Sequence, residues 1–301
     1  MAFEVKATIA TFGGKLLKLT HQSTSTGTPM NVSVYLPPAA LQNSPTSSSS
    51  PLPVLFYLSG LTCTPDNCTE KGFLHAAASP RGIAVVYPDT SPRGANIAGE
   101  DESYDFGTGA GFYVDATAAP WSAHYRMETY VASELPDLLF SDSESGVIPG
   151  FPGVRFDRAR ASITGHSMGG HGALTLFLKY PGRYRSVSAF APIANPVACP
   201  WGQKAFAGYL GDKNDEWKRH DATELVRAGK APAELPALID VGTGDNFYKQ
   251  GQLLPENLEA ALREKGVKGV EVRYHADYDH SYYFISTFAQ DHVNHAAKYL
   301  L

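Results

Sequence analysis

A serine between two spaced glycines is the segment of this chain best suited to chemistry. It reads Gly165-His166-Ser167-Met168-Gly169, with the β-type residues 162–164 before it and the apolar run 173–179 after it. A strand, a tight turn and a helix in this order form a nucleophile elbow, which places its serine at the helix N-terminus. There the helix dipole and the N–H of Met168 can stabilise the oxyanion that forms when Ser167 attacks a carbonyl. The segment therefore predicts a nucleophilic serine, and the alternative is a glycine-rich structural turn.

A serine hydroxyl is a weak nucleophile at neutral pH, so it needs a nearby base and a third group that orients this base. The candidate base is His280, which lies in the loop after the last predicted strand and before the C-terminal helix. A role as a loop histidine that caps this helix is its structural alternative. Other histidines could also serve as the base, one at the end of a strand and two in the terminal helix: His275, His292 and His295.

The candidate orienting carboxylate is Asp245. It follows the predicted strand 238–241 and a glycine-rich turn, whereas Asp240 lies inside that strand and is the less suitable choice. The resulting chain order of serine, acid and histidine is the order found in α/β-hydrolases.

An acyl-transfer site of this kind also needs a second oxyanion donor, a backbone N–H in the loop after an early strand. The loop after residues 54–58 fits, and Leu61 is our candidate, with a simple turn at Ser59-Gly60 as the alternative. Cys63, two residues further on, could be oxidised or bind a soft metal. Its alternative role is that of a small buried hydrophobe.

Four side chains are assigned to the walls of the substrate pocket: Cys63, Trp121, His166 and Trp201. Both tryptophans follow prolines in polar loops, and core packing is their alternative. A metal site formed by His166 and His171 is disfavoured, because a five-residue spacing places two side chains on different sides of a helix. Hydrolysis through a serine nucleophile requires no metal and no organic cofactor, and we predict neither.

The elements that must position these residues follow from the apolar pattern. Residues 15–21 and 30–36 predict antiparallel strands, and the Pro/Ser-rich stretch 37–53 predicts a surface insertion. Later apolar runs alternate with helical stretches, which indicates parallel βαβ units. These runs are 54–58, 83–87, 162–164, 186–190, 238–241 and 270–274. We predict one α/β-hydrolase domain over residues 1–301, with a mostly parallel sheet, antiparallel N-terminal strands and helices on both faces.

Composition limits the class of partner. The chain has 301 residues, 43% of them hydrophobic, and a net charge of −5, which gives no electrostatic reason to expect nucleic acid or an anionic membrane. No run approaches transmembrane length, and the first residues lack the pattern of a signal peptide. The three cysteines form no even disulfide framework. The expectation is a cytoplasmic protein with reduced thiols.

From about residue 56 to residue 301, long segments in consistent order resemble the S-formylglutathione hydrolases, also called esterase D. The similar segments are 58–64, 88–94, 99–103, 105–117, 120–121, 165–172, 186–192, 199–202, 253–257 and 278–284. The resemblance implies hydrolysis of the thioester S-formylglutathione to formate and glutathione, in formaldehyde detoxification. It also implies Ser167 as nucleophile, His280 as base, Asp245 as orienting acid, Leu61 and Met168 as oxyanion donors, and a homodimer.

Three departures from the family pattern are visible. The acid motif reads Gly244-Asp245-Asn246-Phe247 and lacks a neighbouring aspartate, Cys68 stands where many members have an aromatic residue, and the stretch 37–53 is longer than in compact members. Two alternative functions remain. One is a short-chain carboxylesterase or acyltransferase of the same fold, and the other is a non-catalytic binding protein on the same scaffold.

Overall fold

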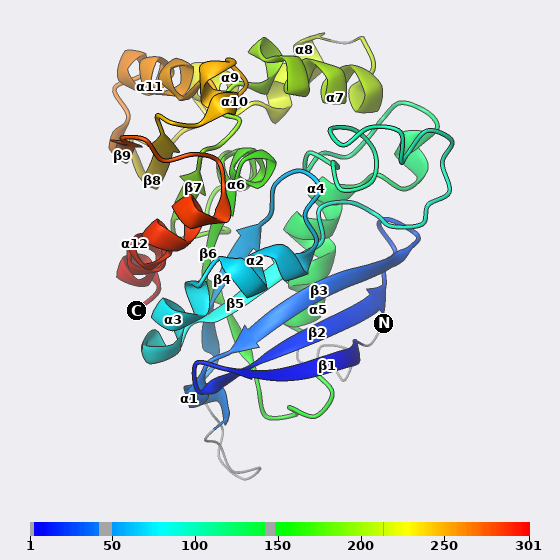
Figure 1. Cartoon of the computed structure of the whole chain (residues 1–301), viewed down its shortest axis with the longest axis vertical. Coiled ribbons are helices and arrows are strands. Elements are labelled where there is room, and N and C mark those ends of the chain that lie inside the picture. Colours follow the sequence, from blue (N-terminus) through cyan, green and yellow to red (C-terminus); the bar gives the residue numbers. More distant parts are fainter. Residues whose placement is uncertain (1–2, 42–49, 142–147, 213) are drawn as a thin grey trace.

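A single mixed sheet runs through the computed structural model, which describes residues 3–41, 50–141, 148–212 and 214–301 (Figure 1). Its strand order is β1-β2-β3-β5-β4-β6-β7-β8-β9. The pairs from β1 to β5 along this order are antiparallel, and the pairs from β5 to β9 are parallel. The strands are β1 (Glu4–Thr11), β2 (Gly14–Gln22), β3 (Pro29–Leu36), β4 (Leu52–Leu58), β5 (Ala84–Pro88), β6 (Phe156–His166), β7 (Val187–Phe190), β8 (Glu234–Gly242) and β9 (Lys268–His275).

Helices cover both faces of the sheet. Figure 1 shows α2, α3 and α12 on one side of the strands and α5 and α6 on the other. Within the described ranges, no helix is long and apolar enough to cross a membrane. The helices are α1 (Pro38–Leu41), α2 (Pro65–Lys71), α3 (Leu74–Ala78), α4 (Met127–Thr129), α5 (Leu135–Leu139), α6 (Met168–Lys179), α7 (Pro200–Leu210), α8 (Asn214–Trp217), α9 (Ala222–Arg227), α10 (Asn246–Lys249), α11 (Pro255–Glu264) and α12 (Tyr282–Leu300).

The predicted α/β fold, with a mostly parallel sheet and antiparallel N-terminal strands, is confirmed. One strand was not predicted: β1, in which Val5, Ala7 and Ile9 alternate with polar residues, although none of its residues is buried. The stretch 37–53 was predicted as a loop, but it contains α1, and β4 already begins at Leu52. The centre of that stretch, residues 42–49, lies outside the described residues.

The middle of the sheet supplies a rigid base for loops at one edge. Every residue of β4 and β5 is buried, as expected for parallel strands covered on both faces. The carboxyl ends of parallel strands lie at the same edge, where ligands bind in open α/β sheets. The loops after β4, β6, β8 and β9 all leave from this edge.

A buried ion pair joins β8 to β9, the two strands that lead to Asp245 and His280. Asp240 on β8 is fully buried, and its two carboxylate oxygens each accept a 2.6 Å hydrogen bond from the guanidinium of Arg273 on β9. His292 Nε2 on α12 lies 3.1 Å from the same carboxylate. Burial raises the pKa of Asp240, but the contacts with Arg273 and His292 outweigh it and hold this pKa below its usual range.

We expect Asp240→Asn to lower the free energy of unfolding by about 3–5 kcal/mol, because it removes the buried partner of Arg273 and leaves that guanidinium only the partly exposed Asp291, 2.9 Å away. Urea denaturation near neutral pH measures this loss. Since the pKa of Asp240 is depressed in the fold, the stabilisation is present above the ordinary carboxyl pKa. It is lost as pH falls through the lower folded value, so the difference between wild type and variant should persist down to about pH 4 and shrink below it.

Asp137→Asn is the matched control for this substitution. Asp137 pairs with Arg158 at 2.9 Å, but its side chain is 67% exposed. An exposed pair contributes about 0–1 kcal/mol, so the control should be nearly neutral. Equal losses in the two variants would contradict the assigned role of Asp240.

Candidate active site

Ser167 lies on a strained turn between β6 and α6. Its backbone has φ 55° and ψ −120°, a conformation that costs a non-glycine residue about 1–3 kcal/mol. The hydrogen bond from Ser167 N to Phe190 O, 2.9 Å long, ties this turn to β7. The turn directs Ser167 to the start of α6, where the first N–H groups have no partner within the helix. Met168 is the first residue of that helix, as predicted.

The elbow requires glycine on both sides of the serine. A Cβ atom at Gly165 would lie 2.4 Å from Gly169 O, and one at Gly169 would lie 2.0 Å from Leu58 O. Both distances are far below van der Waals contact. The two glycines therefore let β6, α6 and the end of β4 approach one another, and this explains the spacing seen in the sequence.

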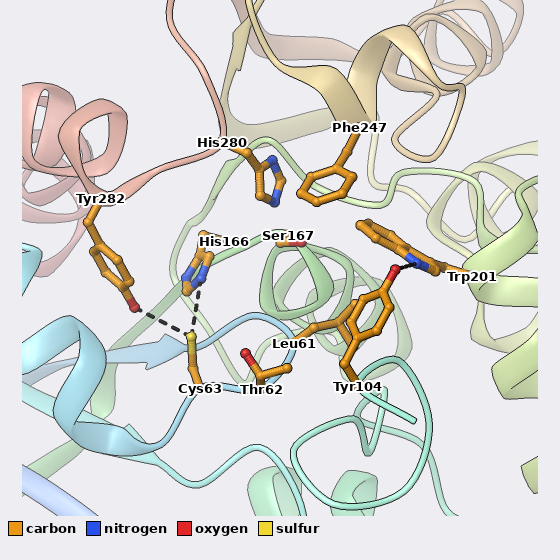
Figure 2. A pocket seen from close by; sticks show the side chains of 10 residues that line it. All are labelled: Leu61, Thr62, Cys63, Tyr104, His166, Ser167, Trp201, Phe247, His280 and Tyr282. Carbon is orange, nitrogen blue, oxygen red and sulfur yellow. Dashed lines mark hydrogen bonds between the residues drawn. The ribbon is translucent and has the colours of Figure 1, made fainter. Parts of the chain in front are cut away.

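Asp245 and His280 are joined by a direct hydrogen bond. Asp245 is fully buried in the turn after β8. Its Oδ1 accepts a 2.7 Å hydrogen bond from Phe247 N, and its Oδ2 lies 2.5 Å from His280 Nδ1. Because an ionised carboxylate only accepts hydrogen bonds, Nδ1 of a neutral His280 carries the proton. Its Nε2 then has a free lone pair. Figure 2 shows the imidazole of His280 above Ser167, at the cavity that both residues line.

Ser167 and His280 line one cavity of about 240 Å³ at the loop edge of the sheet. No hydrogen bond between Ser167 and His280 is recorded among the described residues, and such bonds are often looser before substrate binds. Among the described residues, those that form the walls of the cavity include no Lys, Arg, Asp or Glu. The lining residues are Leu61, Thr62, Cys63, Tyr104, His166, Ser167, Trp201, Phe247, His280 and Tyr282.

The loop between β4 and α2, which carries Leu61, is fixed at several points. The carbonyl of Ser59 accepts a 2.8 Å hydrogen bond from Tyr113 OH, and Gly60 N donates to His166 Nε2 at 3.1 Å. Thr62 N donates to Gly109 O at 2.9 Å. The loop therefore lies rigidly against the elbow, and Leu61 lines the cavity beside Ser167.

Three of the four predicted pocket residues line the cavity. Cys63 is buried, its Sγ lies 3.9 Å from His166 Nε2 and 3.8 Å from Tyr282 OH, and burial raises its pKa, so it is a protonated thiol. Trp201 donates from its indole N–H to Tyr104 OH at 3.2 Å (Figure 2).

The prediction for Trp121 was wrong. Trp121 is absent from the cavity lining, and its ring packs edge-on against Phe106, Tyr125 and Tyr209 with centroid distances of 4.7, 4.8 and 5.6 Å. Burial of a large aromatic surface in this cluster explains its position, which corresponds to the core-packing alternative.

The alternative bases and acid are engaged away from the cavity. His275 and His292 both lie within 3.2 Å of the Asp240 carboxylate, and His295 Nε2 lies 3.1 Å from Pro236 O. Asp240 itself is the partner of Arg273. These groups form the support between β8, β9 and α12 described above.

Four cavity residues were not singled out from the sequence: Thr62, Tyr104, Phe247 and Tyr282. Phe247 and Tyr282 lie within motifs that were identified, two residues after Asp245 and His280 respectively, so their proximity to those residues was an available signal. Tyr104 comes from a distant loop between β5 and α4, and no local pattern indicates its contact with Trp201.

The family model described as "Putative esterase" matches residues 23–295. The S-formylglutathione hydrolase of Rattus norvegicus is 52% identical over 289 residues, which cover 96% of this chain and 95% of that protein. The S-formylglutathione hydrolase of Paracoccus denitrificans (strain Pd 1222) is 49% identical over 300 residues, which cover 100% of this chain and 99% of that protein. The solved structure of an S-formylglutathione hydrolase from Agrobacterium tumefaciens matches with a TM-score of 0.89 and 43% identity, and the match covers 100% of both chains.

The fold, the elbow and these matches define an esterase of the α/β-hydrolase class. Within that class, the chain belongs to the S-formylglutathione hydrolase family, which confirms the resemblance seen in the sequence.

We expect Asp245→Asn to lower kcat by about 10⁴-fold, because an amide at this position no longer holds the proton on Nδ1 of His280. The side chain is nearly isosteric, so KM should change little. Steady-state kinetics with p-nitrophenyl acetate measures both constants. A variant that keeps kcat within about tenfold of the wild type would show that Asp245 does not orient the base.

Proposed function

We propose that this protein hydrolyses S-formylglutathione to formate and glutathione by a serine acyl-enzyme mechanism. The observation that carries the proposal is the hydrogen bond of 2.5 Å between Asp245 and His280 at the cavity that also exposes Ser167. Membership of the family supports the choice of substrate, because its curated members from mammals and bacteria bear the name of this activity.

In the first half of the proposed reaction, Ser167 Oγ attacks the formyl carbon while His280 Nε2 accepts the hydroxyl proton. The carbonyl oxygen becomes an oxyanion, which the N–H groups of Leu61 and Met168 stabilise. When the carbon–sulfur bond breaks, His280 returns the proton to the departing sulfur, and glutathione leaves as a thiol. A formyl ester on Ser167 remains.

In the second half, His280 removes a proton from water as the water oxygen attacks the formyl ester. The same two N–H groups stabilise the second oxyanion. The proton passes to Ser167 Oγ as the ester bond breaks, which restores the serine and releases formic acid, and this acid loses its remaining proton to solvent at neutral pH to give formate. The reaction needs no external oxidant or reductant. We place it in formaldehyde detoxification.

The cavity supports a preference for short acyl groups. Its volume of about 240 Å³ is bounded by the side chains of Trp201, Phe247 and Tyr282. A formyl group fits within such walls, and we expect the side chains closest to Ser167 to favour it over larger acyl groups such as lactoyl. Because the walls carry no charged side chain, small aryl esters should also enter, and a carboxylesterase side activity follows.

The proposal predicts that kcat/KM for S-formylglutathione exceeds that for S-lactoylglutathione by about 100-fold, since we expect the walls near Ser167 to disfavour the larger acyl group in the transition state. We expect Ser167→Ala to lower kcat for S-formylglutathione and p-nitrophenyl acetate by about 10⁶-fold, to the level left by oxyanion stabilisation. Release of free thiol and of p-nitrophenolate measures the two reactions.

Ser162→Ala is the matched control, because Ser162 is buried on β6, the strand that leads to Ser167, and its side-chain hydroxyl lies 2.9 Å from that of Ser186. It should retain activity within about threefold. Activity on the aryl ester alone would keep Ser167 as nucleophile and favour a general short-chain carboxylesterase. Equal loss in both serine variants would contradict the assignment of Ser167.

A further inference from the structure

His166, the residue before Ser167, uses both of its ring nitrogens within the protein. Nε2 lies 3.1 Å from Gly60 N, and Nδ1 lies 2.9 Å from Tyr57 OH. The backbone of this residue belongs to the elbow, while its ring contacts the loop that carries Leu61. One side chain therefore connects the nucleophile with the proposed oxyanion donor.

The hydrogen bond from Gly60 fixes the tautomer of this ring. A backbone N–H can only donate, so Nε2 must present a lone pair, and the proton of the neutral ring lies on Nδ1, which donates to Tyr57 OH. Burial, and to a smaller degree the charge of His280, lowers the pKa of His166 to about 3. His166 is therefore neutral wherever the enzyme works, and Nε2 remains an acceptor.

The contact is close enough to set the position of the loop. A Cβ atom on Gly60 would lie 2.7 Å from His166 Nε2 and 3.0 Å from Ser167 Cβ. The other described contacts hold the loop on either side of Gly60, at Ser59 O and at Thr62 N. Gly60 O accepts a 3.3 Å hydrogen bond from Cys63 N inside the same loop, so among the described contacts the ring of His166 is the partner that ties Gly60, the residue directly before Leu61, to a group outside the loop.

We propose that His166 is a positioning residue whose Nε2 lone pair holds Gly60 N–H and thereby aims the N–H of Leu61 at the substrate oxyanion. This inference rests on the proposed function, in which Leu61 N–H is an oxyanion donor. It gives His166 a role different from that of the pocket wall predicted from the sequence, although its ring also borders the cavity (Figure 2).

Three substitutions separate the acceptor from the volume of the ring. His166→Gln places a carbonyl oxygen near the position of Nε2, whereas the shorter His166→Asn reaches only the position of Nδ1. His166→Phe keeps a ring but has no acceptor. We expect kcat to fall by about 100-fold in the Asn and Phe variants, as for a catalytic group misplaced by about 1 Å, and by about tenfold or less in the Gln variant.

The readout that distinguishes positioning from general disruption is a transition-state analogue. A short trifluoromethyl ketone adds to Ser167 and forms an oxyanion, so its Ki should rise in parallel with the fall in kcat/KM across the series. KM and product inhibition by glutathione should stay within about threefold of the wild type. Thermal melting of each variant shows whether it is folded, and the comparison of Gln with Asn suffices if the Phe variant does not fold.

A Phe or Asn variant with wild-type kcat would overturn the proposal, as would a Gln variant that performs no better than Asn. The proposal would also be overturned if KM, the inhibition constant of glutathione and the Ki of the ketone all rose in parallel, since such a result indicates a collapsed pocket. The same series is run with p-nitrophenyl acetate. If the wild type fails with S-formylglutathione, the proposed substrate is wrong, and the aryl ester still tests His166 separately.

Discussion

Two glycines bring three backbone segments together at the nucleophile elbow, closer than any side chain would allow. The end of β4, the end of β6 and the start of α6 meet at Gly165 and Gly169, where a Cβ atom would lie 2.0–2.6 Å from main-chain oxygen atoms. This contact holds Ser167 in its strained conformation, since a turn at positive φ persists only when its surroundings fix it. It also brings the loop after β4 next to the serine, so that nucleophile and proposed oxyanion donor are placed by a single packing arrangement.

A second support lies under the acid and the base. Asp245 and His280 follow β8 and β9, and the buried pair of Asp240 and Arg273 joins these strands below the loops. The two aspartates of this region therefore have different tasks. Asp240 has a cationic partner inside the sheet and contributes to stability, while Asp245 bonds to a histidine whose other nitrogen faces the cavity. Sequence position alone favoured Asp245, and the partners of each carboxylate give the physical reason.

The sequence was sufficient wherever the information was local. The elbow, the strands at its flanks and the loop positions of Asp245 and His280 could be predicted, because glycine spacing and apolar runs are short-range signals. The strand β1 was missed although Val5, Ala7 and Ile9 alternate with polar residues, because this short pattern lies at the edge of the sheet and includes no large buried side chain. Trp121 was misplaced because a proline-tryptophan pair in a loop does not reveal whether the ring turns toward the cavity or toward Phe106 and Tyr209. The partners of His166 were not foreseen, since Tyr57 and Gly60 lie more than 100 positions before it.

The central claim is that Ser167 carries the acyl group during turnover. The most direct test is to mix the protein with S-formylglutathione, quench the reaction with acid within milliseconds, and locate the formyl group by peptide mass spectrometry. We predict a formyl ester on the peptide that contains Ser167, formed before steady state and absent in Ser167→Ala. Two results would contradict this account. One is a formyl group on the thiol of Cys63, which also lines the cavity, and the other is unchanged turnover in Ser167→Ala.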